Sequence, residues 1–398
     1  MDITIHPSTL RGSVTAIPSK SQAHRLLICA AFADGPTTLL CPNTNRDIEA
    51  TAACLRSLGA QINRTEQGYL IYPISEIPEK AQLTCGESGS TLRFLLPVVG
   101  ALGVDATFIM EGRLPNRPLS PLLEEMERMG CRLSRPTAST LRCCGKLQCG
   151  TYRISGGVSS QFITGLLFAL ARIPGCSSIE IIGTLESKPY VDMTQQAMER
   201  FAIQCKNLQI LGNQIFRTPG TITVEGDWSN GAFFLVAAAL GSPIKIVGLD
   251  KDSAQGDRAI QYLISDLQQY TTISARDIPD LIPILSVLAS ANQGAVFTDI
   301  GRLRLKESDR VASVIAMLEA LGGKAEATDH TLTVYPSDLI GGTVDAMNDH
   351  RIAMSAAIAA TICKEDVTIL NADCVSKSYP KFFEEYRRLG GNYEQYLR

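Results

Sequence analysis

Excess charge of either sign, long apolar runs and a secretory leader are all missing from this chain. Each absence excludes a class of protein. The net charge of the 398 residues is only −3, so no overall basic field attracts nucleic acid. No apolar stretch is long enough to cross a membrane, and the N-terminal residues alternate like a strand and do not resemble a signal peptide. We therefore expect a cytoplasmic protein with neither a nucleic-acid nor a membrane partner.

Metal-ligand and nucleotide motifs are missing as well. The chain has only four histidines, none at metal spacing, and twelve scattered cysteines. The cysteines crowd only at residues 131–149, without two matched CxxC pairs. The glycine-containing segment 86–91 lacks the GK[ST] ending of a nucleotide-binding P-loop. The sequence thus predicts reduced thiols, no zinc site and no nucleotide hydrolysis.

Amphipathic helical patterns that end near a glycine recur along the chain. Clear copies end at residues 59, 130, 322 and 390, and weaker ones lie at 198–203 and 267–273. Glycine just past the last apolar turn is a helix C-cap signal, and a short β-like segment follows most copies. Further strand patterns lie at 37–40, 69–72, 106–110, 178–182, 221–225, 244–247 and 331–335. Six helix-to-strand units in a chain of this length predict an α/β fold with three units in each of two domains.

Cations stand at four expected helix starts, where they are electrostatically misplaced. They occur within residues 19–25, 86–93, 306–310 and 348–351. A helix N-terminus already carries about half a positive charge, so a cation there costs about 0.3–1 kcal/mol. The same ends suit anions, because their first backbone N–H groups have no partner within the helix. Repetition of the arrangement predicts a cavity for several negative groups.

Polar side chains at the first of these starts, and at a further helix start without a cation, are candidate anion ligands. Ser21 and Arg25 lie four residues apart and share a helical face, with Lys20 in the preceding turn. The alternative is a capped surface helix with solvated charges. Two serines and a glutamine at 159–161 offer neutral hydrogen bonds for a phosphate or a polyol, although serine caps are common in any helix.

Five further residues have a functional and a structural interpretation. Asp280 precedes a strongly apolar stretch, so it is either an N-cap or a general base whose pKa burial raises. Lys306 and Arg310 form an i,i+4 pair that could also be a surface salt-bridge ladder. Lys377 has a solvated loop as its alternative. Arg117 stands close to two prolines, which reduces the entropy lost when it holds an anion.

Taken together, these motifs resemble the 5-enolpyruvylshikimate-3-phosphate synthase family. The resemblance runs from Pro18-Ser19-Lys20-Ser21 to Lys377-Ser378-Tyr379-Pro380, which is nearly the whole chain. Its most specific pieces are Lys306-Glu307-Ser308-Asp309-Arg310, Asn348-Asp349-His350-Arg351, Ser187-Lys188-Pro189-Tyr190 and Ser159-Ser160-Gln161. All of them occur in the family order.

The resemblance implies a two-domain inside-out α/β barrel with six repeated βαβαββ units, three in each domain. Residues 1–13 and 227–398 would form the domain that contains both termini. Residues 14–226 would form a second domain, inserted between two hinge segments, and the active site would lie in the cleft between the domains.

The implied reaction transfers the enolpyruvyl group of phosphoenolpyruvate to the 5-hydroxyl of shikimate 3-phosphate. It releases phosphate through a tetrahedral intermediate. Catalysis would rest on Asp280 as base toward the hydroxyl, Glu307 as acid toward the methylene carbon, and Lys20 near both substrates. The residues implied to bind shikimate 3-phosphate are Lys20, Ser21, Arg25, Ser159, Ser160, Gln161, Ser187, Tyr190, Asp280 and Lys306. Those implied to bind phosphoenolpyruvate are Lys20, Gly89, Arg117, Gln161, Arg310, Arg351 and Lys377.

By the same resemblance the protein needs no cofactor and no metal, works as a monomer in aromatic amino-acid biosynthesis, and is inhibited by glyphosate. Three positions depart from a common family form, which has asparagine, proline and asparagine where this chain has Glu87, Phe94 and Arg302. We expect Glu87 to pair with a cleft arginine, for example Arg302.

Two other functions remain as alternatives. One is enolpyruvyl transfer to UDP-N-acetylglucosamine, but the sister family carries a cysteine in the loop that here reads 111–118 without one. The other is a non-catalytic binding protein on the same scaffold, against which the presence of Lys20, Asp280 and Glu307 argues.

Overall fold

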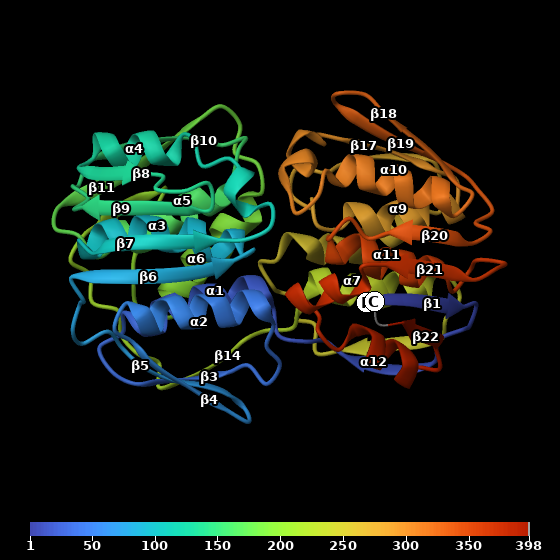
Figure 1. Ribbon diagram of the computed structural model, residues 1–398, viewed down its shortest axis with the longest axis horizontal. Helices are drawn as coiled ribbons and strands as arrows, with labels where there is room; N and C mark the ends of the chain where they lie inside the picture. Colours follow the sequence, from blue (N-terminus) through green and yellow to red (C-terminus); the bar gives the residue numbers. More distant parts are fainter. Residues whose placement is uncertain (397–398) are drawn as a thin grey trace. The chain divides into compact units, whose positions relative to one another are not determined.

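The computed structural model describes residues 1–396 and divides the chain into two compact units (Figure 1). Unit 1 comprises Met1–Ile17 and the chain from Gly226 onward, and unit 2 comprises Pro18–Glu225. The sequence places the first crossing after residue 13. In the structure the chain stays in unit 1 through Ile17, because β2 (Gly12–Thr15) pairs in parallel with β15 (Ile244–Val247) of that unit.

Unit 2 contains three four-stranded sheets with the same topology. In each, two parallel strands are followed by two antiparallel ones, in the orders β14-β3-β5-β4, β6-β7-β9-β8 and β10-β11-β13-β12. The strands are β3 (Thr37–Leu40), β4 (Gln61–Thr65), β5 (Gly68–Tyr72), β6 (Lys80–Gly86), β7 (Asp105–Met110), β8 (Cys131–Ser134), β9 (Thr140–Gly145), β10 (Thr151–Ser155), β11 (Cys176–Ile182), β12 (Cys205–Lys206), β13 (Gln209–Leu211) and β14 (Thr221–Thr223).

Unit 1 repeats this topology twice and truncates it once. The sheets β16-β17-β19-β18 and β20-β21-β1-β22 each have one parallel and two antiparallel pairings, whereas the third sheet consists of the parallel pair β15-β2 alone. The remaining strands are β1 (Asp2–His6), β16 (Thr271–Ser274), β17 (Ala295–Thr298), β18 (Lys324–Ala327), β19 (Thr331–Tyr335), β20 (Gly342–Asp345), β21 (Val367–Leu370) and β22 (Asn392–Tyr396).

Three helices fill the centre of each unit, and their sequences explain why. Helices α1 (Lys20–Ala31), α3 (Gly89–Leu102) and α5 (Ser160–Leu170) are buried on nearly every face in unit 2. So are α7 (Trp228–Ala239), α9 (Ile282–Ala291) and α11 (His350–Ala359) in unit 1. A helix that is apolar all round has to be buried, so the sheets enclose these helices, as an inside-out barrel requires.

The other helices are amphipathic or short and lie nearer the surface of each unit. They are α2 (Arg46–Ser57), α4 (Leu122–Arg128), α6 (Lys188–Glu199), α8 (Ile260–Asp266), α10 (Arg310–Ala320) and α12 (Phe382–Arg388), with 3₁₀ turns at Leu114–Asn116, Gly256–Ala259, Gly301–Leu305 and Ala372–Lys377. No helix within residues 1–396 combines the length and the hydropathy that a membrane crossing demands.

The polar ends of the central helices begin with short capping side chains. Ser19, Ser88 and Ser159 accept backbone N–H bonds at the starts of α1, α3 and α5. Asp227 and Asp349 do the same for α7 and α11. These caps satisfy only part of each helix end. Several of the predicted site residues lie at these helix starts, among them Lys20, Gly89, Ser160 and Arg351.

Candidate active site

Arg25 is the centre of a polar cluster at the start of α1 in unit 2. Its guanidinium is 2% exposed and donates to Thr194 Oγ1 (2.8 Å), to the Ser21 carbonyl (2.6 Å) and to the Tyr190 carbonyl (2.9 Å). A weaker bond reaches Thr164 Oγ1 at 3.4 Å. Every one of these acceptors is neutral. A buried cation held only by neutral oxygens favours a negatively charged ligand.

The surroundings of Arg25 explain why it can be buried. Its guanidinium carbon lies 5.0 Å from the centre of the Phe94 ring, a cation–π distance. Burial lowers the pKa of Arg25 to about 10, which still leaves it charged at neutral pH. The Phe94 ring, at a position where the related pattern has proline, therefore packs against the Arg25 guanidinium.

Lys20 begins α1 and is held by the neighbouring helix. Its Nζ lies 2.9 Å from Asp47 Oδ2 on α2, and both side chains are largely buried. A positively charged residue in the first turn of a helix opposes the helix dipole. The Asp47 carboxylate offsets that cost, so the surface-helix interpretation of this segment is wrong.

The starts of α3 and α5 are joined by a second polar cluster. Arg93 donates to Gln161 Oε1 (2.8 Å) and to the Pro118 carbonyl (3.0 Å), and Gln161 Nε2 donates to Ser90 Oγ (2.9 Å). Gly89 lies against Arg117, because a Cβ atom added to Gly89 would be 2.8 Å from the Arg117 Nη1 atom. Sequence reasoning left Arg93 and Ser90 out of the candidate site, although Arg93 had been noted as a cation at a helix start.

The remaining unit 2 candidates line the same helix ends. Ser159 caps α5 by accepting the Gln161 N–H at 3.3 Å, and Ser160 is buried beside it. Ser187 precedes α6 in a left-handed conformation (φ 57°), which is uncommon for a residue other than glycine. Three residues later Tyr190 offers the carbonyl that Arg25 binds. All ten predicted site residues of unit 2 therefore lie at or beside the starts of four helices, α1, α3, α5 and α6.

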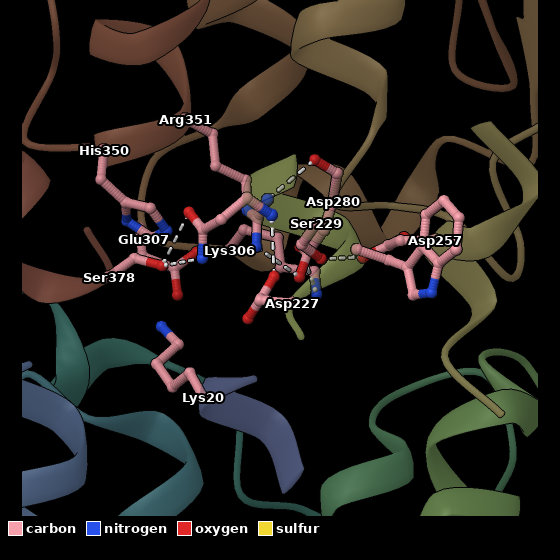
Figure 2. A network of polar contacts seen from close by, with 12 residues as sticks. Lys20, Asp227, Ser229, Asp257, Asp280, Lys306, Glu307, His350, Arg351 and Ser378 are labelled. Atoms are coloured by element: carbon pink, nitrogen blue, oxygen red, sulfur yellow. Dashed lines mark hydrogen bonds and ion pairs between the residues drawn. The ribbon is translucent and has the colours of Figure 1, made fainter. Parts of the chain in front are cut away.

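Unit 1 builds its site around one buried arginine, Arg310, and Figure 2 shows Asp280, Lys306, Glu307 and Arg351 of the same cluster. Arg310 is 1% exposed and donates from its three guanidinium nitrogens to three different carboxylates. These are Asp349 Oδ2 at 2.8 Å, Asp280 Oδ1 at 2.6 Å and Glu307 Oε2 at 2.7 Å. The carboxylates hold the pKa of Arg310 well above its usual value despite its burial. The surface-ladder interpretation of this residue is therefore wrong.

Asp280 is close to three cations, which overturns the cap interpretation and the expected direction of its pKa shift. It does not cap α9, whose N-cap residue is Leu281 without a side-chain cap bond. Arg351 Nη2 lies 3.1 Å from Asp280 Oδ2, and Lys306 Nζ lies 3.6 Å from Oδ1. Burial alone would raise the pKa of Asp280, but Arg351, Lys306 and Arg310 hold it well below its usual range. The expectation of a raised pKa is wrong because these three cations stabilise the ionised carboxylate. They come from α11, the loop before α10, and α10 itself.

Lys306 and Lys377 complete the cationic side of this cluster. Burial lowers the pKa of Lys306 to about 8, although the nearby Asp280 opposes the change. Lys377 is 5% exposed, and its Nζ donates to the Asn348 carbonyl at 2.9 Å. The solvated-loop interpretation of Lys377 is therefore wrong. Among the described residues, no group of three or more His, Cys, Asp or Glu side chains could hold a metal ion.

Asp349 is a member of the cluster that sequence reasoning did not assign to the site. It is fully buried, accepts from Arg310, and caps α11 through the Arg351 N–H at 3.0 Å. Its signal was present in the Asn-Asp-His-Arg motif. The motif was interpreted through its cations, so the carboxylate that orients two of them was overlooked.

Chemically, the two clusters differ. Unit 2 offers cations and neutral donors, which bind anions and hydroxyls. Unit 1 offers two partly exposed carboxylates, Asp280 and Glu307, each bound to a buried arginine. Such carboxylates can exchange protons once their cations find other anions.

Known proteins resemble this chain over nearly its whole length. The chain matches the family model described as EPSP synthase (3-phosphoshikimate 1-carboxyvinyltransferase) over residues 5–386. The 3-phosphoshikimate 1-carboxyvinyltransferase of Clostridium kluyveri is 38% identical over 99% of this chain and 98% of that protein. That of Clostridium perfringens strain 13 is 40% identical, with 98% of each chain covered.

Two solved structures share the fold. The EPSP synthase of Acinetobacter baumannii aligns with a TM-score of 0.80 at 21% identity, covering 99% of this chain and 100% of that chain. The enolpyruvyl transferase NikO of Streptomyces tendae aligns with a TM-score of 0.77 at 17% identity, covering 99% and 98%. The predicted α/β fold with six repeated units is therefore confirmed.

Proposed function

The chain belongs to the EPSP synthase family, and from that premise we propose how its two clusters divide the reaction. Its activity is that of a 3-phosphoshikimate 1-carboxyvinyltransferase, a transferase of the shikimate pathway and of aromatic amino-acid biosynthesis. The family acts on shikimate 3-phosphate and phosphoenolpyruvate. Residue roles, mechanism and the joint action of the two units are our proposals.

Unit 2 binds most of shikimate 3-phosphate in this proposal. Arg25, Lys20 and the serines at the starts of α1 and α5 hold the phosphate, carboxylate and hydroxyl groups of this substrate. The support is the burial of Arg25 among acceptors that are all neutral. The residues assigned to this substrate are Lys20, Ser21, Arg25, Ser159, Ser160, Gln161, Ser187, Tyr190, Asp280 and Lys306.

Phosphoenolpyruvate brings a phosphate and a carboxylate, and both need cations. The cations assigned to it from unit 2 are Lys20 and Arg117, and those from unit 1 are Arg310, Arg351 and Lys377, with Gly89 and Gln161 beside them. The two units would therefore act on one pair of substrates in the cleft between them. A decrease in the radius of gyration when both ligands are added, measured by small-angle X-ray scattering, supports this; an unchanged radius contradicts it.

Proton transfer is assigned to the two carboxylates of unit 1. Asp280 takes the proton of the 5-hydroxyl as that oxygen bonds to C2 of phosphoenolpyruvate, and Glu307 delivers a proton to C3. The C2–O bond to phosphate then breaks, C3 returns a proton to the Glu307 carboxylate, and phosphate leaves. In the resting protein three cations keep Asp280 a weak base. Substrate anions that draw these cations away raise its pKa and activate it when the site is filled.

A single observation carries this assignment, namely that Arg310 donates to both Asp280 and Glu307. The expected base and the expected acid thus share one buried cation. A substrate anion bound at Arg310 would change both pKa values together.

The test is phosphate release from phosphoenolpyruvate with shikimate 3-phosphate or UDP-N-acetylglucosamine as acceptor. We expect release with shikimate 3-phosphate alone, and loss of at least about a thousandfold in kcat for Asp280→Asn. Asp299→Asn is the matched control, because that carboxylate contacts Arg276 away from the cluster and stands at a positive φ that asparagine tolerates. Phosphate release with the UDP-sugar alone contradicts the assignment. No phosphate release by the folded protein with either acceptor favours a binding protein.

Inhibition by glyphosate is proposed on the geometry of Gly89. A methyl group at this position would lie 2.8 Å from Arg117 Nη1 and 3.2 Å from Arg93 Nη1, so the two guanidinium groups would have to shift. We expect glyphosate to compete with phosphoenolpyruvate and Gly89→Ala to weaken that inhibition more than it weakens substrate binding. Equal loss of both would contradict the proposal.

We also propose that the protein acts as a monomer in the cytoplasm, where the family acts in bacteria. A molar mass near that of one 43.0 kDa chain by light scattering supports the first part. A mass of two chains at working concentration contradicts it. Recovery of the activity in the cytoplasmic fraction of the source cell tests the second part.

A further inference from the structure

Four buried polar side chains form a continuous hydrogen-bonded line beneath the unit 2 site. His24 Nδ1 lies 2.7 Å from Thr51 Oγ1, Thr51 Oγ1 lies 2.7 Å from Thr91 Oγ1, and Thr91 Oγ1 lies 2.7 Å from Ser88 Oγ. The exposed fraction of each residue is 1% or less. The line passes from α1 through α2 to the start of α3. None of its members has a role in the mechanism above.

The hydrogen bonds in this line all run in one direction, from His24 toward Ser88. Thr91 Oγ1 donates to Ser88 Oγ, and a hydroxyl has one proton, so at its contact with Thr51 it accepts. Thr51 Oγ1 therefore donates its only proton to Thr91 Oγ1, and it accepts a hydrogen bond from His24 Nδ1–H. His24 stays neutral because burial, together with Lys20 and Arg25, keeps its pKa well below the usual value. Its Nε2, which has no partner among the described residues, is accordingly the unprotonated nitrogen.

The two ends of the line lie at the two substrate subsites of unit 2. His24 directly precedes Arg25, and its ring packs edge-on against Phe94, which lies under the Arg25 guanidinium. At the other end Ser88 is the N-cap of α3, where its Oγ accepts the Thr91 N–H at 3.2 Å. The next residue is Gly89. Ser88 Oγ accepts two bonds, so its rotamer is set by Thr91 and, through it, by Thr51.

We propose that His24, Thr51 and Thr91 are positioning residues that fix the start of α3 for phosphoenolpyruvate, through Ser88. The proposal rests on the function proposed above. A pair of threonine hydroxyls can also serve packing alone, as the partly buried pair Thr37 and Thr218 does at 2.8 Å elsewhere in unit 2. A positioning role differs from a packing role because it changes one Michaelis constant selectively.

The test compares two substitutions of the central residue. Thr51→Val keeps the shape and removes the hydroxyl, whereas Thr51→Ser keeps the hydroxyl. We expect Thr51→Val to raise the KM for phosphoenolpyruvate about tenfold, the effect of one lost buried hydrogen bond, and to change the KM for shikimate 3-phosphate by less than about twofold. Thr51→Ser should restore the wild-type value. Thr37→Val, the matched control, should leave both constants unchanged.

Equal increases of both constants, no increase, or the same increase in Thr37→Val would overturn the proposal. The tautomer of His24 provides a measurement that does not depend on activity. In ¹⁵N-histidine-labelled wild-type protein we expect a neutral ring protonated at Nδ1 from pH 6 to 8, identified by its absence in His24→Gln. A ring protonated at Nε2 would overturn the direction of the hydrogen bonds in this line, and the proposal with it. If wild-type protein lacks transferase activity while the Nδ1 tautomer is present, it is the proposed function that fails.

Discussion

Replacing Asp257 by asparagine should change how the stability of unit 1 depends on pH. Asp257 lies in the 3₁₀ turn Gly256–Ala259 with 3% of its surface exposed. The Ser229 hydroxyl donates to its Oδ2, while Oδ1 has no partner among the described residues. Burial, and secondly the negative charge of Asp280, raise the pKa of Asp257 to about 7 against the opposing effect of Arg351.

The size and sign of the effect follow from proton linkage. The pKa rises from 3.8 to about 7, and at about 1.4 kcal/mol for each pH unit this amounts to about 4 kcal/mol. A raised pKa means that the folded protein holds the proton more tightly than the unfolded chain. The contribution is therefore complete below about pH 4 and is lost as the pH rises through 7. Asparagine has no proton to lose, so the variant gains about 4 kcal/mol relative to the wild type between pH 4 and pH 8.

The single tryptophan provides the assay. Trp228 is 3% exposed on α7, immediately before Ser229, so its fluorescence reports the unfolding of unit 1. Urea unfolding of wild type and Asp257→Asn at pH 5, 6, 7 and 8 should give midpoints that diverge as the pH rises. Asp338→Asn, at an exposed carboxylate, controls for the loss of one charge. Parallel midpoints at every pH would show that Asp257 is ionised throughout and would refute the reasoning.

Three further substitutions test other parts of the structure. Because the pKa of Lys306 is about 8, kcat/KM for shikimate 3-phosphate should fall above that pH, and Lys306→Arg should move the fall beyond pH 9; an unmoved profile would exclude Lys306 as its source. Gly165→Ala places a methyl group 2.3 Å from the Arg93 carbonyl oxygen and should lower the free energy of unfolding by about 3 kcal/mol, whereas an unchanged denaturation midpoint would contradict this contact. Asp349→Asn removes one of the three carboxylates of Arg310 and should cost about 2 kcal/mol in Trp228-monitored unfolding; a cost below about 0.5 kcal/mol would show that the other two suffice.

Local sequence signals were sufficient for many of the helices and strands. The strand patterns at 37–40, 244–247 and 331–335 match β3, β15 and β19 residue for residue, because a proline adjoins each run and bounds it. Cations at helix starts likewise marked the correct segments. Both kinds of signal depend on neighbours within about one helical turn.

Properties that depend on distant partners were not predictable in this way. The pKa of Asp280 is set by Lys306, Arg310 and Arg351, which follow it by 26 residues or more in the sequence. The repeat pattern at 267–273 is followed by a strand, as expected, but this strand does not belong to the same repeat unit. It leads into β16, the edge strand of the next sheet, because the sheet of β15 and β2 has no antiparallel hairpin of its own. The absence of this hairpin could not be recognised from the residues around it.

The strand order of unit 1 has a consequence for how the chain folds while it is being made. β1 occupies an inner position of its sheet, between β21 (Val367–Leu370) and β22 (Asn392–Tyr396). β1 therefore leaves the ribosome before Pro18–Glu225, whereas its neighbours β21 and β22 follow that segment, which can close its own core in the meantime. Until then the Ile3 and Ile5 side chains and both edges of β1 lack their native cover, so we expect unit 2 to complete its core before unit 1 does.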